Sequence, residues 1–164
     1  MLPNHLATEA EALLALLRSQ DLRLATAESC TGGLIAALLT ETAGSSDIFE
    51  RGFVTYSNAA KTEMLGIDPM LISAHGAVSE PVARAMAEGA LTHSAADISV
   101  AVTGIAGPGG GSAEKPVGLV HIAAARRGAP TQHRRCEFGD RGRGQIREAS
   151  VAVAFELVRG LATD

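Results

Sequence analysis

A serine and a lysine stand at two turns of the sequence where catalysis is well placed. Ser29 lies in a polar turn that follows a short apolar segment and precedes two glycines and a second apolar segment. A serine hydroxyl becomes an effective nucleophile when a base takes its proton, and an uncharged lysine can be that base. Lys61 falls in the first turn of a short predicted helix, where the helix dipole disfavours an ammonium. Together the two residues indicate nucleophilic catalysis.

Each residue near this turn also has a simpler interpretation. Ser29 or Thr31 could cap the helix that follows, as serine and threonine often do. Lys61 could be a solvated lysine on a helix surface. Glu28 could orient Lys61, or it could serve as a surface or capping carboxylate. Cys30 is more simply a small buried side chain than a second nucleophile, so the residue types leave these alternatives open.

Hydrophobic spacing and turn signals predict the elements that position these residues. The helical period predicts helices at 6–17, 32–43, 59–65, 79–94 and 144–161, with Asn58 as the cap of the third. Short apolar runs predict strands at 22–27, 49–56, 98–103, 118–126 and 132–138, the last two as a hairpin. Their order predicts an α/β fold, a three-layer α/β/α domain in which a mixed, mostly parallel sheet has about five strands. A single domain is expected over residues 1–164. Ser29 and Lys61 are then expected at the carboxyl edge of the sheet, where sites of open α/β sheets lie.

A glycine-rich segment follows the predicted strand at 98–103. Five of the eight residues at 104–111 are glycine, which predicts a loop whose backbone comes close to a ligand. A dinucleotide oxidoreductase is a weak interpretation, because the helix and the acidic ribose residue of that fingerprint do not follow.

The overall composition excludes several classes of protein. Fourteen Lys and Arg against eighteen Asp and Glu give a net charge of -4, which argues against general nucleic-acid affinity. Cys30 and Cys136 lie far apart without a CxxC pattern, so neither a disulfide framework nor a zinc site is indicated. No export signal or membrane-length apolar run is present. A cytoplasmic protein is therefore expected.

Four segments resemble a known family. They are TAESCTGG at 26–33, GFVTYSN at 52–58 with Lys61 after it, GAVS at 76–79 and TGIAGPGG at 103–110. In this order they closely resemble the CinA carboxy-terminal domain family, the nicotinamide-nucleotide amidohydrolases or NMN deamidases. The resemblance covers nearly the whole chain. Larger members carry a second, amino-terminal domain, and this chain resembles the stand-alone form.

The resemblance implies hydrolysis of the carboxamide of nicotinamide mononucleotide to nicotinate mononucleotide and ammonia, in NAD recycling. It implies no cofactor and no metal, a small-molecule nucleotide as the partner, and no nucleic-acid or membrane partner; a homo-oligomer stays open. It implies Ser29 as nucleophile, Lys61 as general base and Tyr56 as a neighbour that positions or shuttles the proton. The substrate-binding positions that it implies are Cys30, Thr31, Gly32, Gly33, Thr103, Gly104, Gly107, Gly109 and Gly110.

One arginine position departs from the family pattern. The family shows Gly-Asp-Arg with a second arginine four residues after the first, whereas this chain has Arg141, Arg143 and Arg147. We favour Arg143 as the substrate-facing side chain, because positions i and i+4 share a helix face. The alternative to an amidase is a non-catalytic nucleotide-binding or regulatory module of the same fold. The presence of Ser29, Tyr56 and Lys61 together favours the enzyme.

Overall fold

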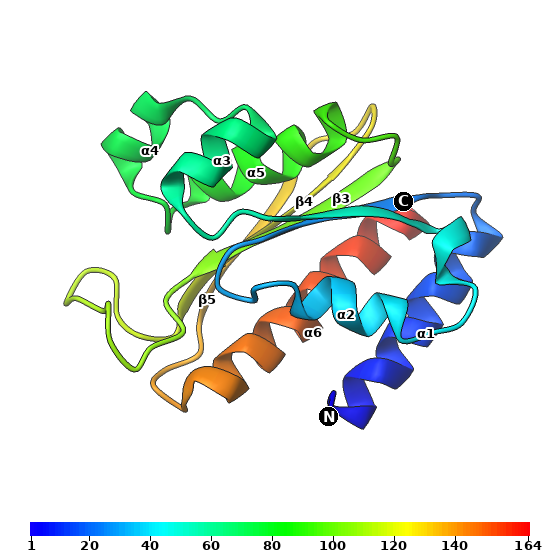
Figure 1. The fold of residues 1–164 in the computed structure, drawn as a ribbon, viewed down its shortest axis with the longest axis horizontal. Helices are drawn as coiled ribbons and strands as arrows, with labels where there is room; N and C mark the ends of the chain where they lie inside the picture. The colour runs from blue at the N-terminus through cyan, green and yellow to red at the C-terminus, as the bar shows by residue number, and fades with distance from the viewer.

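A five-stranded sheet runs through the middle of the computed structural model, which describes residues 1–164 (Figure 1). Its strands, in the order β2-β1-β3-β4-β5, pair in parallel from β2 to β3 and antiparallel from β3 to β5. Because β5 reverses the direction of β4, every strand except β4 points the same way. The strands are β1 (Leu24–Glu28), β2 (Phe49–Val54), β3 (Ile98–Gly104), β4 (Leu119–Arg126) and β5 (Gln132–Glu137).

Helices cover both faces of the sheet, which gives the three layers visible in Figure 1. One layer holds α1 (Asn4–Ser19), α2 (Leu34–Thr40) and α6 (Arg143–Thr163). The other holds α3 (Asn58–Leu65), α4 (Pro69–His75) and α5 (Glu80–Thr92). A short 3-10 turn, Ser45–Asp47, precedes β2. The predicted α/β/α architecture and mixed sheet are confirmed.

Strand alternation divides the core between the two helical layers. Leu24 packs in the core under α1, α2 and α6, whereas Ala25 and Ala27 pack in the core under α5. The α5 side of the sheet is lined by small residues, among them Ala101 and Ala123. Small side chains let a helix approach the sheet closely at native packing density. Successive residues of β1 therefore face different helical layers, and the same alternation applies at the end of the strand, to Glu28 and Ser29.

Helix α3, which carries Lys61, packs closely against α5. A Cβ atom at Gly89 of α5 would collide with the carbonyl oxygen of Leu65, the last residue of α3. Leu65 is itself buried at 2% exposure. Glycine at position 89 thus lets the carboxyl end of α3 press against α5.

Several local predictions need correction. The helix predicted at 32–43 begins at Leu34, because Gly32 and Gly33 take positive φ angles of 57° and 98° that break the helical geometry. Asn58 is not the cap of α3; the Ser57 hydroxyl instead accepts a hydrogen bond from the Ala60 N–H at 3.0 Å. Helix α4 was missed in the sequence, although Asp68 caps it and Pro69 opens it.

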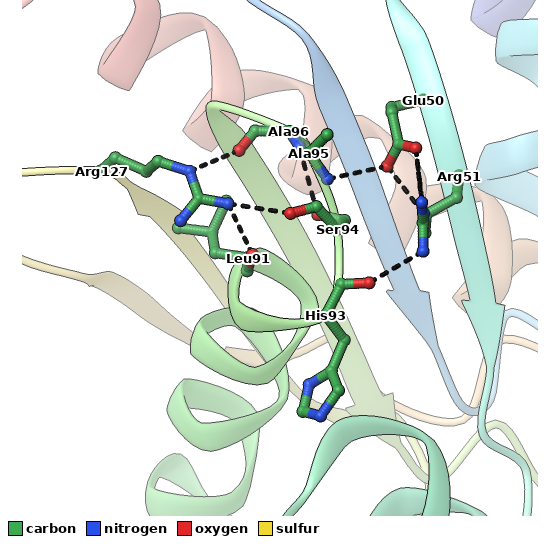
Figure 2. A network of polar contacts seen from close by, with 8 residues as sticks. All are labelled: Glu50, Arg51, Leu91, His93, Ser94, Ala95, Ala96 and Arg127. Atoms are coloured by element: carbon green, nitrogen blue, oxygen red, sulfur yellow. Dashed lines mark hydrogen bonds and ion pairs between the residues drawn. The ribbon is translucent and has the colours of Figure 1, made fainter.

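Charged side chains fasten the amino edge of the sheet, opposite the end of β1 where Ser29 lies (Figure 2). Glu50 of β2 accepts the Ala95 N–H at 3.2 Å, and Arg51 donates to the His93 carbonyl at 2.9 Å. Arg127 donates to three carbonyls at the end of α5 and in the turn after it, those of Leu91, Ser94 and Ala96. These contacts join β2, the end of α5 and the end of β4.

No helix is both long and apolar enough to cross a membrane.

Candidate active site

The turn after β1 holds Ser29 at the carboxyl edge of the sheet. The Ser29 N–H extends the ladder by donating to the Val102 carbonyl at 2.9 Å, and the Ser29 carbonyl accepts the Gly32 N–H at 3.0 Å. No backbone carbonyl accepts the N–H groups of Cys30, Thr31 and Gly33. Free N–H groups beside a nucleophile are suited to bind an oxyanion.

Lys61, a residue of α3, contacts the Ser29 hydroxyl. Its Nζ lies 3.0 Å from Ser29 Oγ and donates to the Thr55 carbonyl at 2.8 Å. Lys61 is only 1% exposed, and neither hydrogen bond goes to a carboxylate. Burial of the ammonium lowers the pKa of Lys61. An uncharged amine can keep the bond to Thr55 and still accept the Ser29 proton through its lone pair.

A pocket of about 250 Å³ opens in front of Ser29. Gly-rich loop residues form one wall, and the turn after β1 forms another. A larger hollow of about 780 Å³ lies on the other side of this loop, and neither Ser29 nor Lys61 lines it. The smaller pocket is therefore the candidate site. Its predicted members are Ser29, Cys30, Tyr56, Gly104, Gly107, Gly109, Gly110 and Arg143, joined by Ile105 and Ala106.

Arg143 bridges two sides of this pocket from the first turn of α6. Its Nη1 donates to the Gly107 carbonyl and its Nη2 to the Tyr56 hydroxyl, each at 2.8 Å. Arg141 does not line the pocket. The pocket therefore contains the arginine that shares a helix face with Arg147.

Comparison with known proteins identifies the family. The profile of the CinA C-terminal domain matches residues 6–162. The chain belongs to the CinA C-terminal domain family. CinA-like proteins of Akkermansia muciniphila and Chlorobaculum tepidum are 59% and 52% identical to it over 122 and 155 residues. Those alignments cover 74% and 91% of this chain but 30% and 36% of the relatives, so the chain spans about a third of their length.

Solved structures of the CinA superfamily share the fold closely. A competence/damage inducible protein of Agrobacterium tumefaciens superposes with a TM-score of 0.95 at 50% identity, over 98% of both chains. A CinA superfamily protein of Escherichia coli gives a TM-score of 0.89 at 33% identity, over 95% of this chain and 90% of that one.

Four predicted binding positions of this CinA domain lie outside the pocket lining. Thr31, Gly32 and Gly33 belong to the turn after Ser29 but do not line the pocket, and Thr31 is fully buried. Thr103 is 1% exposed, and its hydroxyl donates to the Ala77 carbonyl at 2.9 Å. Thr103 thus holds the loop before α5 in place, and the GAVS segment lies in that loop.

Glu28 serves the opposite helical layer. It is fully buried, and its two carboxylate oxygens accept the N–H groups of Ile35 at 2.9 Å and Ala36 at 3.1 Å. These are first-turn donors of α2, so Glu28 is the capping carboxylate and neither Ser29 nor Thr31 caps the helix through its side chain. The alternation of β1 could have shown this, because position 28 shares the face of Leu24.

Cys30 has the character of a buried thiol. It is 7% exposed, and burial raises its pKa to about 11. A thiol with so high a pKa carries almost no thiolate at neutral pH. Ser29 rather than Cys30 is hydrogen-bonded to the Lys61 amine, at 3.0 Å, so this contact and the burial of the thiol both favour Ser29 as the nucleophile.

Proposed function

We propose that this CinA domain is an amidase that hydrolyses the carboxamide of nicotinamide mononucleotide with Ser29 as nucleophile. The observation that carries the proposal is the 3.0 Å contact between Ser29 Oγ and the buried Lys61 Nζ. A nucleotide-binding module does not need a nucleophile beside a base. The choice of nicotinamide mononucleotide rests on the family resemblance of the sequence. The cytoplasm is the proposed location.

The reaction runs in two halves. Ser29 Oγ attacks the amide carbon while Lys61 takes its proton, and the N–H of Cys30, which lines the pocket, stabilises the oxyanion. The carbon–nitrogen bond breaks, and the proton on Lys61 leaves with the amine as ammonia. Water then attacks the acyl-serine with Lys61 as base, which releases nicotinate mononucleotide and restores the Ser29 hydroxyl.

Two neighbours have defined parts in this proposal. Arg143 is a cation at the mouth of the pocket and is suited to an anionic group of the substrate. Its bond to the Tyr56 hydroxyl keeps that side chain at the pocket mouth, although Tyr56 is 61% exposed.

Ammonia release from nicotinamide mononucleotide tests the proposal. We expect turnover by the wild-type chain without added metal, almost none by Ser29→Ala, and full turnover by Ser19→Ala, an exposed serine at the end of α1. Binding of the nucleotide without ammonia release in the wild type would instead support the non-catalytic module.

A further inference from the structure

Arg147 of α6 contacts the turn that carries the proposed nucleophile, Ser29. Its Nη2 donates to the Thr31 carbonyl at 2.8 Å, which is the only hydrogen bond of its guanidinium. The same Nη2 lies 3.7 Å from the position that a Cβ of Gly32 would occupy. The Arg147 guanidinium therefore packs directly against the Thr31–Gly32 peptide.

This peptide group is held at both ends. Its carbonyl, on Thr31, accepts from Arg147 and from the Leu34 N–H at 3.0 Å. Its N–H, on Gly32, donates to the Ser29 carbonyl at 3.0 Å. Because glycine tolerates positive and negative φ alike, a peptide next to Gly32 and Gly33 can flip at low cost unless contacts oppose it. Arg147 supplies the one side-chain hydrogen bond to this peptide group.

A purely structural arginine would be expected to use more of its donors. The Nε of Arg147 is buried and has no partner, and unsatisfied buried donors are costly. Arg147 also lies one helical turn after Arg143, so two cations stand near the positive end of α6. Such an arrangement costs stability and is typical of functional sites.

From these contacts we infer that Arg147 is a positioning residue for the amidase reaction. By holding the Thr31 carbonyl it keeps the Gly32 N–H on the Ser29 carbonyl, and so keeps the Cys30 N–H of that same peptide directed at the oxyanion. Arg147 does not touch the substrate. The inference rests on the proposed function, because it requires Ser29 to be the nucleophile. It predicts an effect on the chemical step and little effect on substrate binding.

Kinetics of Arg147→Ala test this role. We expect kcat to fall about a hundredfold, the size expected when oxyanion donors are misplaced, with KM changed less than about threefold. Added guanidinium ion, below denaturing concentration, should restore part of kcat. The matched control is Arg134→Ala, which removes an exposed guanidinium of β5 that pairs with Glu156 of α6 at 2.6 Å. An unchanged kcat, or a loss confined to KM, would overturn the inference.

A second readout does not depend on the substrate. A fluorophosphonate forms a bond between Ser29 Oγ and phosphorus while fluoride leaves and Lys61 takes the hydroxyl proton; its phosphoryl oxygen occupies the oxyanion position. Intact-protein mass should show labelling at least about tenfold slower in Arg147→Ala than in the wild type and Arg134→Ala. Equal labelling rates would refute the role of Arg147.

The two readouts separate the possible failures. A wild type that is labelled at Ser29 but releases no ammonia from nicotinamide mononucleotide would disprove the substrate while the labelling comparison still tests Arg147. If the wild type is not labelled at Ser29, the assignment of Ser29 as the nucleophile is wrong, and the inference about Arg147 is wrong as well. If Arg147→Ala does not fold, Arg147→Lys, which keeps the charge but not the planar fork, provides the same comparison.

Discussion

Glu28 and Ser29 are neighbours in the chain, yet their side chains serve opposite layers of the molecule. The Glu28 carboxylate binds the first turn of α2, whereas the Ser29 hydroxyl meets Lys61 of α3. The alternation of a strand imposes this division. One residue stabilises the helix behind the turn, and the next is free for the chemistry in front of it.

Lys61→Met should abolish most activity without destabilising the fold. Removal of a general base costs about a hundred- to ten-thousandfold in kcat. Methionine fills a similar volume, and the burial cost of an amine that has no carboxylate partner disappears. We expect a melting temperature equal to or above that of the wild type. A variant that melts well below the wild type would show that Lys61 is needed for folding.

The rate should rise with pH. Lys61 acts only when uncharged, and burial lowers its pKa from the ordinary lysine value. The ascending limb of kcat/KM against pH should therefore lie below about 10.4, the pKa of an unperturbed lysine. A profile that declines as the pH rises from neutral would contradict the assignment of Lys61 as base.

Glu28→Gln should destabilise the protein. Its amide can accept only one of the two α2 N–H groups and brings its own donors against the other, so we expect a loss of about 1–3 kcal/mol in the free energy of unfolding. Glu63→Gln, at an exposed position of α3, is the control. Urea titration measures both variants, and equal midpoints would rule out the capping role.

Acid should destabilise the fold through His121. This side chain is 7% exposed and contacts His133 at 2.9 Å, and burial lowers its pKa from 6.5 to about 4. Lys115, Arg135 and the His133 ring also lower the pKa, whereas Glu80 at the start of α5 raises it. Between about 4 and 6.5 the unfolded chain binds more protons than the folded one, so the stabilisation is complete above 6.5 and is lost as the pH falls through 4.

Substitution separates this effect from general acid unfolding. His121→Phe keeps an aromatic ring without a titrating group, so its free energy of unfolding should fall less steeply between pH 6.5 and 4. Denaturant titrations at several pH values provide the comparison. Identical slopes in the two proteins would assign the acid sensitivity to other groups.

Sequence patterns predicted the sheet well because its strands are bounded by turn residues and its three central strands, β1, β3 and β4, are buried on both faces and so form nearly continuous apolar runs. The role of Glu28 could have been predicted from the alternation of β1, because position 28 shares a face with Leu24, but residue type alone left it open. The contact of Ser29 with Lys61 depends on how closely α3 packs on α5, which the Gly89 position permits and no local pattern reveals. The sequence indicated Arg147 only through its spacing from Arg143. Its hydrogen bond to the Thr31 carbonyl joins residues far apart in the chain, and no local sequence pattern predicts such a contact.

The fastening of the amino edge by Glu50, Arg51 and Arg127 has a consequence for how this domain can evolve (Figure 2). These contacts lie at the end of the sheet away from Ser29, so substitutions around the pocket leave them in place. The Gly-rich loop and Tyr56 line the pocket, so they can change without loss of the contacts at the amino edge. Natural variation in specificity should therefore concentrate at one rim of the molecule.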